Sequence, residues 1–145
     1  MKITINNQSY DVAEGQTILQ ACQTAGIRIP TLCFLKDVST NASCGICVVE
    51  VKGARSLLRS CITKVTEGME ITTHNERIAT ARCINTELLL ANHPQDCLGC
   101  DRNQNCELQT ITYEMGITDK HFVRTRKEVL KKDVSSLSLV RDPEK

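Results

Sequence analysis

The sequence has few aromatic residues and no excess of either charge, and both shortages narrow what the chain can do. Its 145 residues include two Tyr, two Phe and no Trp, whereas proteins that bind single-stranded nucleic acid stack bases on aromatic side chains. The chain has eighteen Lys and Arg and seventeen Asp and Glu, which gives a net charge of +1. The basic excess of a nucleic-acid binder is therefore missing. We therefore expect no nucleic-acid partner.

Long apolar runs and nucleotide-binding motifs are also missing. No uninterrupted apolar stretch exceeds four residues, far short of the roughly 20 that a membrane-spanning helix needs. Residues 1–6 alternate and then turn polar, unlike the apolar core of a signal peptide. Neither G-x-G-x-x-G nor a P-loop occurs, and the sequence shows no recognisable catalytic pair of a nucleophile and a base. We expect a cytoplasmic chain that does not span a membrane and has no catalytic residues of its own.

Cysteine, by contrast, is abundant. The chain holds nine Cys, and an odd number in a cytoplasmic protein argues against a framework of disulfides. Metal ligation is the usual alternative use of so many thiols. Because large hydrophobic side chains are scarce, bound metal would also supply part of the folding free energy, as it does in other small metal domains.

The first half of the sequence predicts a small mixed sheet with one helix packed on it. Residues 1–6 and 9–13 alternate around Asn6-Asn7, which indicates a β-hairpin. A helix is expected after Glu14, closed by Gly26. Further strands are expected at 46–51, 56–62 and 69–73. The segment 31–45 has no periodicity, and a loop of that length inside a compact domain is usually functional.

The second half predicts helices separated by a Cys-rich loop. Asn75 is expected to cap a helix that runs to Asn92, where Pro94 stops it. A shorter helix is expected over 107–115. The long helix should bury one apolar stripe, made of Ile78, Ala81, Ile84, Leu88 and Ala91. Two cysteines stand outside the motifs: Cys22 is expected in the core and Cys83 as a partly exposed thiol.

Four of the remaining cysteines form the pattern C-x10-C-x2-C-x13-C. They are Cys33, Cys44, Cys47 and Cys61. A 2Fe–2S cluster needs four thiolates, two on each iron, and backbone N–H groups near its sulfides. Gly45 allows the backbone to approach such a cluster where a Cβ would block it. A structural zinc site also takes four Cys, although it more often pairs two C-x2-C motifs.

The second group has the pattern H-x3-C-x2-C-x5-C and lies within one loop. Its members are His93, Cys97, Cys100 and Cys106. This tight spacing can wrap a 4Fe–4S cluster, and Gly99 again permits close approach of the backbone. A zinc site with three Cys and one His fits the same spacing. Three thiolates and a neutral imidazole would give an oxidised 4Fe–4S site one less negative charge than four thiolates, which raises its reduction potential.

The two groups, in this order and with their flanking residues, resemble one family. The residues that carry the resemblance are 29–33, 43–51 and 92–100. They resemble the N-terminal iron–sulfur module of the catalytic subunit of NAD(P)-linked FeFe hydrogenases. The same module forms the N-terminal part of the large subunit of respiratory complex I, of the diaphorase subunit of NAD-reducing hydrogenases and of some NAD-dependent formate dehydrogenases.

The resemblance implies an α+β chain in three parts. Residues 1–74 would form a β-grasp, ferredoxin-like domain holding a 2Fe–2S cluster on Cys33, Cys44, Cys47 and Cys61. Residues 75–116 would be a small helical segment holding a 4Fe–4S cluster on His93, Cys97, Cys100 and Cys106. Residues 117–145 would be a polar tail or linker.

The implied role is to relay single electrons within a larger redox complex. The expected partners are a flavin- and NAD-binding subunit, a thioredoxin-like 2Fe–2S subunit and further ferredoxin-type iron–sulfur domains. Residues 131–145 resemble the lead-in to a two-cluster ferredoxin domain, so the chain is expected to be a shortened subunit or a fragment. The alternatives are a zinc-stabilised interaction domain without a redox role and a docking subunit that keeps its clusters.

Overall fold

The computed structural model describes residues 1–94, 96–119, 121–124 and 128–143. Gln95, within the second motif, and Glu144 and Lys145, at the end of the tail, lie outside the described residues. The chain divides into two compact units, Met1–Asn85 and Thr86–Lys145. Each unit contains one of the two groups of candidate ligands.

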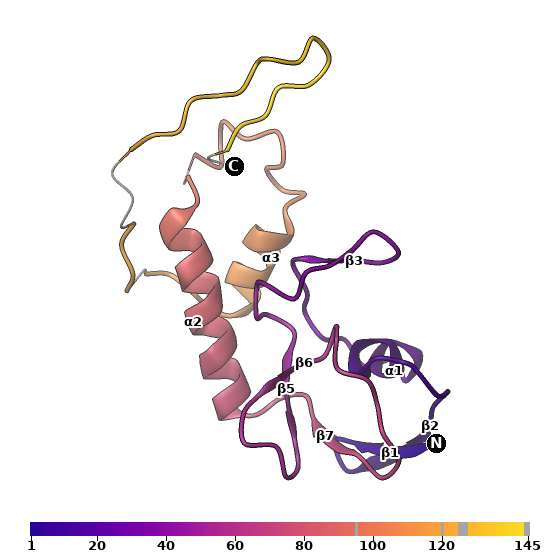
Figure 1. Ribbon diagram of the computed structural model, residues 1–145. Helices are drawn as coiled ribbons and strands as arrows, with labels where there is room; N and C mark the ends of the chain where they lie inside the picture. Colours follow the sequence, from indigo (N-terminus) through magenta and orange to yellow (C-terminus); the bar gives the residue numbers. More distant parts are fainter. Residues whose placement is uncertain (95, 120, 125–127, 144–145) are drawn as a thin grey trace. The chain divides into compact units, whose positions relative to one another are not determined.

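The first unit is built on a five-stranded mixed sheet (Figure 1). Its strands are β1 (Lys2–Ile5), β2 (Gln8–Asp11), β5 (Val48–Val51), β6 (Leu58–Arg59) and β7 (Glu70–Thr72). Their order across the sheet is β2-β1-β7-β5-β6. Strand β1 pairs parallel with β7, and the other neighbours pair antiparallel. The expected mixed sheet is confirmed.

Local sequence explains the turns at the start of this unit. Asn6 and Asn7 both have positive φ, 49° and 67°, as the tight turn of a two-residue β-hairpin requires. Helix α1 (Ile18–Thr24) begins at a capping box, in which the Thr17 side chain accepts from the Gln20 N–H and the Gln20 side chain accepts from the Thr17 N–H. Both the hairpin and the helix match the sequence expectation.

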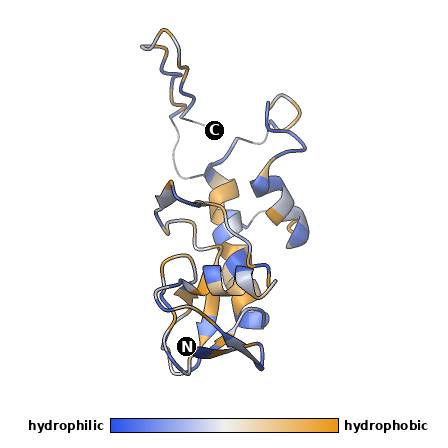
Figure 2. Ribbon diagram, turned by 90° about the vertical axis from the view of Figure 1, so that its right-hand side faces the viewer, coloured by the Kyte–Doolittle hydropathy of each residue, from blue (hydrophilic) through white to orange (hydrophobic). Residues whose placement is uncertain are grey.

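The core of the first unit is aliphatic and lies between α1 and the sheet. Alternate residues of β1, Ile3 and Ile5, are fully buried, and Ile18 and Leu19 of α1 pack in the same cluster. Cys22 also belongs to this cluster, as expected, and burial raises the pKa of its thiol to about 11. Hydrophobic colouring in Figure 2 gathers on the central strands.

The segment 31–45 is more regular than its sequence suggests. It contains a short antiparallel pair, β3 (Phe34–Leu35) and β4 (Ser39–Thr40). Asp37 turns the chain between them with a φ of 60°. Strands of two residues leave no alternation to detect, so the sequence alone predicts only a loop here.

Helix α2 (Glu76–Asn92) begins at the expected cap, where Asn75 Oδ1 accepts from the Ile78 N–H at 2.8 Å. The expected apolar stripe, however, is only partly buried. Ile78 is fully buried, but Ile84 is 43 % and Leu88 45 % exposed, whereas Thr86 and Glu87 are buried. The helix contributes 76–85 to the first unit and its remainder to the second. Within the described residues, no helix is long and apolar enough to cross a membrane.

The second unit holds the end of α2, the Cys-rich loop, helix α3 (Glu107–Glu114) and the tail. Buried Thr86 donates its hydroxyl to Met115 Sδ at 3.4 Å. Glu87 accepts from the backbone N–H of His121 at 3.1 Å and pairs with its Nδ1 at 2.8 Å. Among the described residues of the tail, Asp133 and Arg141 form an antiparallel bridge.

Candidate metal centres

The first group of candidate ligands gathers at one end of the β5–β6 hairpin. Cys33 directly precedes β3, Cys44 and Cys47 lie on the segment that enters β5, and Cys61 follows β6. Because Val48 pairs with Arg59 in the antiparallel register, the chain brings Cys47 and Cys61 to neighbouring positions. Both of these thiols are 2 % exposed, whereas Cys33 and Cys44 are half-buried.

The four thiols associate as two pairs. Burial raises the pKa of Cys61 to about 12, and a hydrogen bond and the charge of Cys47 add to the shift, with smaller contributions from Cys33 and Cys44. Burial would also raise the pKa of Cys33, but hydrogen bonds from Cys44 and Ser43 outweigh it and lower the pKa. The four sulfur atoms therefore form one cluster of interacting groups, in which Cys33 contacts Cys44 and Cys47 contacts Cys61.

This pairing fits a 2Fe–2S cluster, which takes two thiolates on each iron. A single zinc ion would instead draw its four ligands around one point. The donor set and its arrangement in pairs suit the iron–sulfur group.

Backbone contacts fix the loop that carries Cys44 and Cys47. The N–H of Ile46 donates to the Cys44 thiol, the kind of donor that a cluster thiolate needs. Ser60, which is fully buried, donates its hydroxyl to the carbonyl of Cys47 at 2.7 Å. The same carbonyl accepts from the N–H of Ser60 at 3.2 Å. Cys47 is thus held from its backbone side while its thiol faces Cys61.

Gly45 is required for a reason that its sequence position did not reveal. Its φ is +67°, and an added Cβ would lie 2.6 Å from Asn85 Nδ2. Asn85 donates from that nitrogen to the Gly45 carbonyl at 3.0 Å. The close neighbour of Gly45 in the structure is therefore the side chain of Asn85, on α2.

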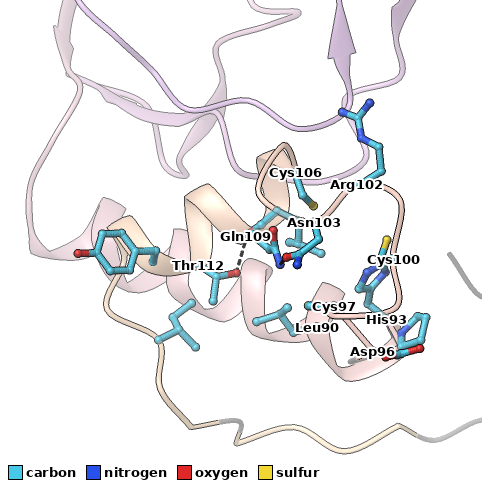
Figure 3. A pocket seen from close by; sticks show the side chains of 14 residues that line it. Leu90, His93, Asp96, Cys97, Cys100, Arg102, Asn103, Cys106, Gln109 and Thr112 are labelled. Atoms are coloured by element: carbon cyan, nitrogen blue, oxygen red, sulfur yellow. Dashed lines mark hydrogen bonds between the residues drawn. The ribbon is translucent and has the colours of Figure 1, made fainter.

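The second group of candidate ligands lines one cavity of about 380 Å³ (Figure 3). His93 follows the last turn of α2, Cys97 and Cys100 lie on the loop, and Cys106 is the N-cap residue of α3. All four line the cavity together with apolar side chains that include Leu90 and Ile117. The structure therefore brings together the four residues that the spacing singled out.

Hydrogen bonds within the loop determine where these residues lie. Asp96 Oδ1 accepts from the Gly99 N–H at 3.2 Å, and a Cβ on Gly99 would lie 2.5 Å from Asp96 Oδ2. Gln109 of α3 accepts from the Gln104 N–H at 3.1 Å and donates to Asn103 Oδ1 at 3.1 Å. Gln109 thereby fastens the segment between Cys100 and Cys106. Its role was not foreseen, because an isolated Gln after a Cys carries no motif.

The donor set of this cavity fits a 4Fe–4S cluster. Three thiols and one imidazole face a mostly apolar space, and apolar surroundings are one of the controls on cluster potential. Cys106 makes no side-chain cap hydrogen bond, so its sulfur stays available at the N-terminus of α3.

Comparison with known families matches both parts of the chain. Residues 1–76 match the 2Fe–2S iron–sulfur cluster binding domain, and residues 82–121 match the NADH-ubiquinone oxidoreductase-G iron–sulfur binding region. These matches favour iron–sulfur clusters over the zinc alternative that the spacing had left open. The chain therefore carries a 2Fe–2S binding domain and a 4Fe–4S binding region.

Similar proteins are large redox subunits. The NADP-reducing hydrogenase subunit HndD of Solidesulfovibrio fructosivorans is 43 % identical over the whole of this chain, which covers 26 % of that subunit. An NADH-quinone oxidoreductase subunit of Rhizobium meliloti is 38 % identical over 92 % of this chain and 16 % of its own length. NADPH-Fe(3+) oxidoreductase subunit alpha of Geobacter sulfurreducens is 38 % identical over 84 % of this chain and 14 % of its own length.

A solved structure extends the comparison. A chain of the NAD⁺-reducing [NiFe]-hydrogenase in the H₂-reduced state superposes with a TM-score of 0.89 and 31 % identity, covering 99 % of this chain and 60 % of that one. The present chain spans about a quarter or less of the curated relatives. It belongs to the family of 2Fe–2S iron–sulfur cluster binding domains and is an iron–sulfur electron-transfer module of the kind found in NAD(P)-linked hydrogenase and complex I-type subunits.

Proposed function

We propose that the chain relays single electrons through two centres with separate ligand sets. Cys33, Cys44, Cys47 and Cys61 would hold the 2Fe–2S cluster, and His93, Cys97, Cys100 and Cys106 the 4Fe–4S cluster. The observation that carries this assignment is that the eight side chains form two separate groups, four interacting thiols and four residues around one cavity. When bound, the clusters supply one-electron redox chemistry.

The protein's own part is to bind and tune these groups. Residues 1–74 would act as the 2Fe–2S domain, 75–116 as the 4Fe–4S segment and 117–145 as a tail or linker. In the first centre, Cys33–Cys44 would ligate one iron and Cys47–Cys61 the other, because these are the thiols in mutual contact. In the second, the single imidazole would leave the centre less negative than four thiolates would.

The larger activity is proposed by likeness to the relatives. The module would serve an NAD(P)-linked, hydrogenase-type oxidoreductase in the cytoplasm. Its partners would be a flavin- and NAD-binding subunit and ferredoxin-type iron–sulfur domains. Support comes from the relatives, which are named as subunits of NADP-reducing hydrogenase and NADPH-Fe(3+) oxidoreductase. The chain itself would hold no catalytic residue, because its functional groups are cluster ligands.

Three single substitutions test the ligand assignment on the anaerobically purified chain. Cys47→Ser should change the EPR signal of the 2Fe–2S centre alone, and Cys97→Ser that of the 4Fe–4S centre alone. Cys83→Ser is the matched control, because Cys83 lies on α2 outside both groups, and it should leave both signals unchanged. A change in both signals from either ligand variant, or from the control, would overturn the assignment.

A purely docking role makes a different prediction. If the chain only docks, Cys97→Ser would leave both assembly with its partner subunits and NAD(P)H-driven electron transfer intact. If the chain is a relay, the same variant would still assemble while electron transfer fails. Measuring copurification and NAD(P)H-driven reduction on the same preparation separates the two.

A further inference from the structure

Two side chains of α2 hold the backbone on either side of Cys47. Asn85 Nδ2 donates to the carbonyl of Gly45 at 3.0 Å, and Arg82 Nη2 donates to the carbonyl of Val48 at 2.8 Å. Arg82 and Asn85 are three residues apart, so they share one face of the helix. The match to the 2Fe–2S domain ends at residue 76. Both side chains therefore lie outside that domain and within the matched 4Fe–4S region, residues 82–121.

Asn85 determines which way the Gly45–Ile46 peptide faces. In a trans peptide the C=O and N–H groups point in opposite directions, and no cis peptide occurs among the described residues. The Gly45 carbonyl faces Asn85, and the Ile46 N–H donates to the Cys44 thiol. Because a carbonyl only accepts, the atom that Asn85 presents must be its amide nitrogen. Asn85 therefore aims a backbone donor at a candidate cluster ligand.

Arg82 places a positive charge beside the same segment. Its guanidinium also donates to the carbonyl of Thr73 at 3.2 Å, so the side chain joins the start of β5 to the end of β7. Burial lowers the pKa of Arg82, and the nearby charge of Cys47 raises it. Because the guanidinium stays protonated in proteins and is only partly exposed to water, its charge near Cys47 is screened less than that of a fully exposed side chain.

We propose that Arg82 and Asn85 are positioning residues that raise the reduction potential of the 2Fe–2S centre. Asn85 acts through the Ile46 N–H, and Arg82 through a charge fixed next to Cys47. Reduction adds one negative charge to the centre, and N–H donors and nearby cations stabilise that charge. The proposal rests on the ligand set proposed above. It makes the first turns of α2 part of the 2Fe–2S site.

The test is a redox titration of the full chain with both clusters loaded, in which EPR spectra monitor the reduction of each centre. Arg82→Gln and Asn85→Ala should each lower the equilibrium constant for reducing the 2Fe–2S centre about tenfold, a shift of about 59 mV for one electron. The 4Fe–4S centre serves as an internal reference and should not shift. Arg82→Lys, which keeps the positive charge, should restore most of the Arg82 effect.

Arg77→Gln is the matched control for charge. Arg77 lies on the same helix but pairs with Glu50 at 2.7 Å on the surface, so its loss should leave the 2Fe–2S potential unchanged. For Asn85, pulsed EPR in D₂O should show a weaker exchangeable-deuteron coupling in Asn85→Ala. If Asn85→Ala loses the cluster, Asn85→Ser, whose shorter side chain does not reach the Gly45 carbonyl, is measured instead.

Two results separate failure of this proposal from failure of the ligand assignment. An intact 2Fe–2S signal with an unshifted potential in both Arg82→Gln and an Asn85 variant would overturn the positioning role, even if thermal stability falls. Absence of any 2Fe–2S signal from the unsubstituted chain would overturn the proposed ligand set itself.

Discussion

Replacing Gly45 by Ala tests whether the contact between the cluster loop and α2 is as tight as the structure places it. Gly45 has a φ of +67°, and a Cβ there would lie 2.6 Å from Asn85 Nδ2 and 3.1 Å from its Cγ. Gly26 offers a matched control, because its φ is +73° and a Cβ would meet nothing within 4 Å. The two substitutions share the backbone strain and differ in the steric clash.

The expected magnitudes follow from these two contributions. A left-handed conformation costs a residue with a Cβ roughly 1–2 kcal/mol. Both Gly26→Ala and Gly45→Ala should therefore lower the free energy of unfolding by this amount. Overpacking against a fixed neighbour costs roughly a further 1–3 kcal/mol, and only Gly45→Ala should show this additional destabilisation. Because Asn85→Ala removes the clashing atoms, the double variant should be less destabilised than the sum of the singles by roughly 1–3 kcal/mol.

The assay is thermal unfolding of the anaerobic, cluster-loaded protein at one scan rate, with iron content measured alongside. The unfolding midpoint should fall in the order wild type, Gly26→Ala, Gly45→Ala. The double variant Gly45→Ala/Asn85→Ala should lie above the value that additivity gives. Equal midpoints for Gly45→Ala and Gly26→Ala, or strict additivity in the double variant, would refute the contact between Gly45 and Asn85.

Three further substitutions probe the two centres. Ser60→Ala removes one of the two hydrogen bonds that the buried Cys47 carbonyl accepts from Ser60, so it should cost about 0.5–1.5 kcal/mol and speed the decay of 2Fe–2S absorbance. An unchanged decay rate would contradict this. His93→Cys should lower the 4Fe–4S potential in a redox titration, because a fourth thiolate adds one negative charge; a higher potential would argue against His93 as a ligand. Gln109→Leu removes both loop contacts and should lower 4Fe–4S occupancy with the 2Fe–2S signal retained, whereas parallel loss of both would contradict a local role.

Local signals predicted much of the fold. The Asn6-Asn7 turn, the capping box at Thr17 and the cap at Asn75 all follow rules that depend on a few neighbouring residues. These interactions are strong enough within their own segment that the rest of the chain does not override them. The hairpin, the cap at Asn75 and the buried Cys22 therefore agree with expectation.

The predicted burial of the α2 side chains was wrong where tertiary contacts determine which face of the helix is buried. The apolar stripe of α2 places Ile84 and Leu88 in the interior, yet both are exposed. Hydrophobic periodicity treats each side chain by its own polarity, but Arg82 and Asn85 turn inward because the carbonyls of Gly45 and Val48 need donors there. A buried polar contact of this kind leaves no trace in a periodicity pattern.

The candidate ligands were accessible from sequence because cluster loops need fixed spacings of a rare residue type. The structure brings the four thiols of the first group and the four side chains of the second into two separate sites. The supporting residues were not accessible, since Ser60 and Arg82 act on backbone carbonyls 13 and 34 residues away in sequence. Gln109 acts on the neighbouring loop, at Gln104, but no motif marks it. Such contacts depend on where the strands and helices meet.

The central claim, two iron–sulfur centres of different nuclearity in this one chain, is tested most directly by metal analysis combined with spectroscopy. Iron, zinc and acid-labile sulfide are measured on anaerobically purified protein, and EPR is recorded after reduction with dithionite. The account predicts about six iron atoms per chain and two separate signals, one from a 2Fe–2S and one from a 4Fe–4S centre. Stoichiometric zinc without iron, reproduced after iron-replete anaerobic expression, would contradict it.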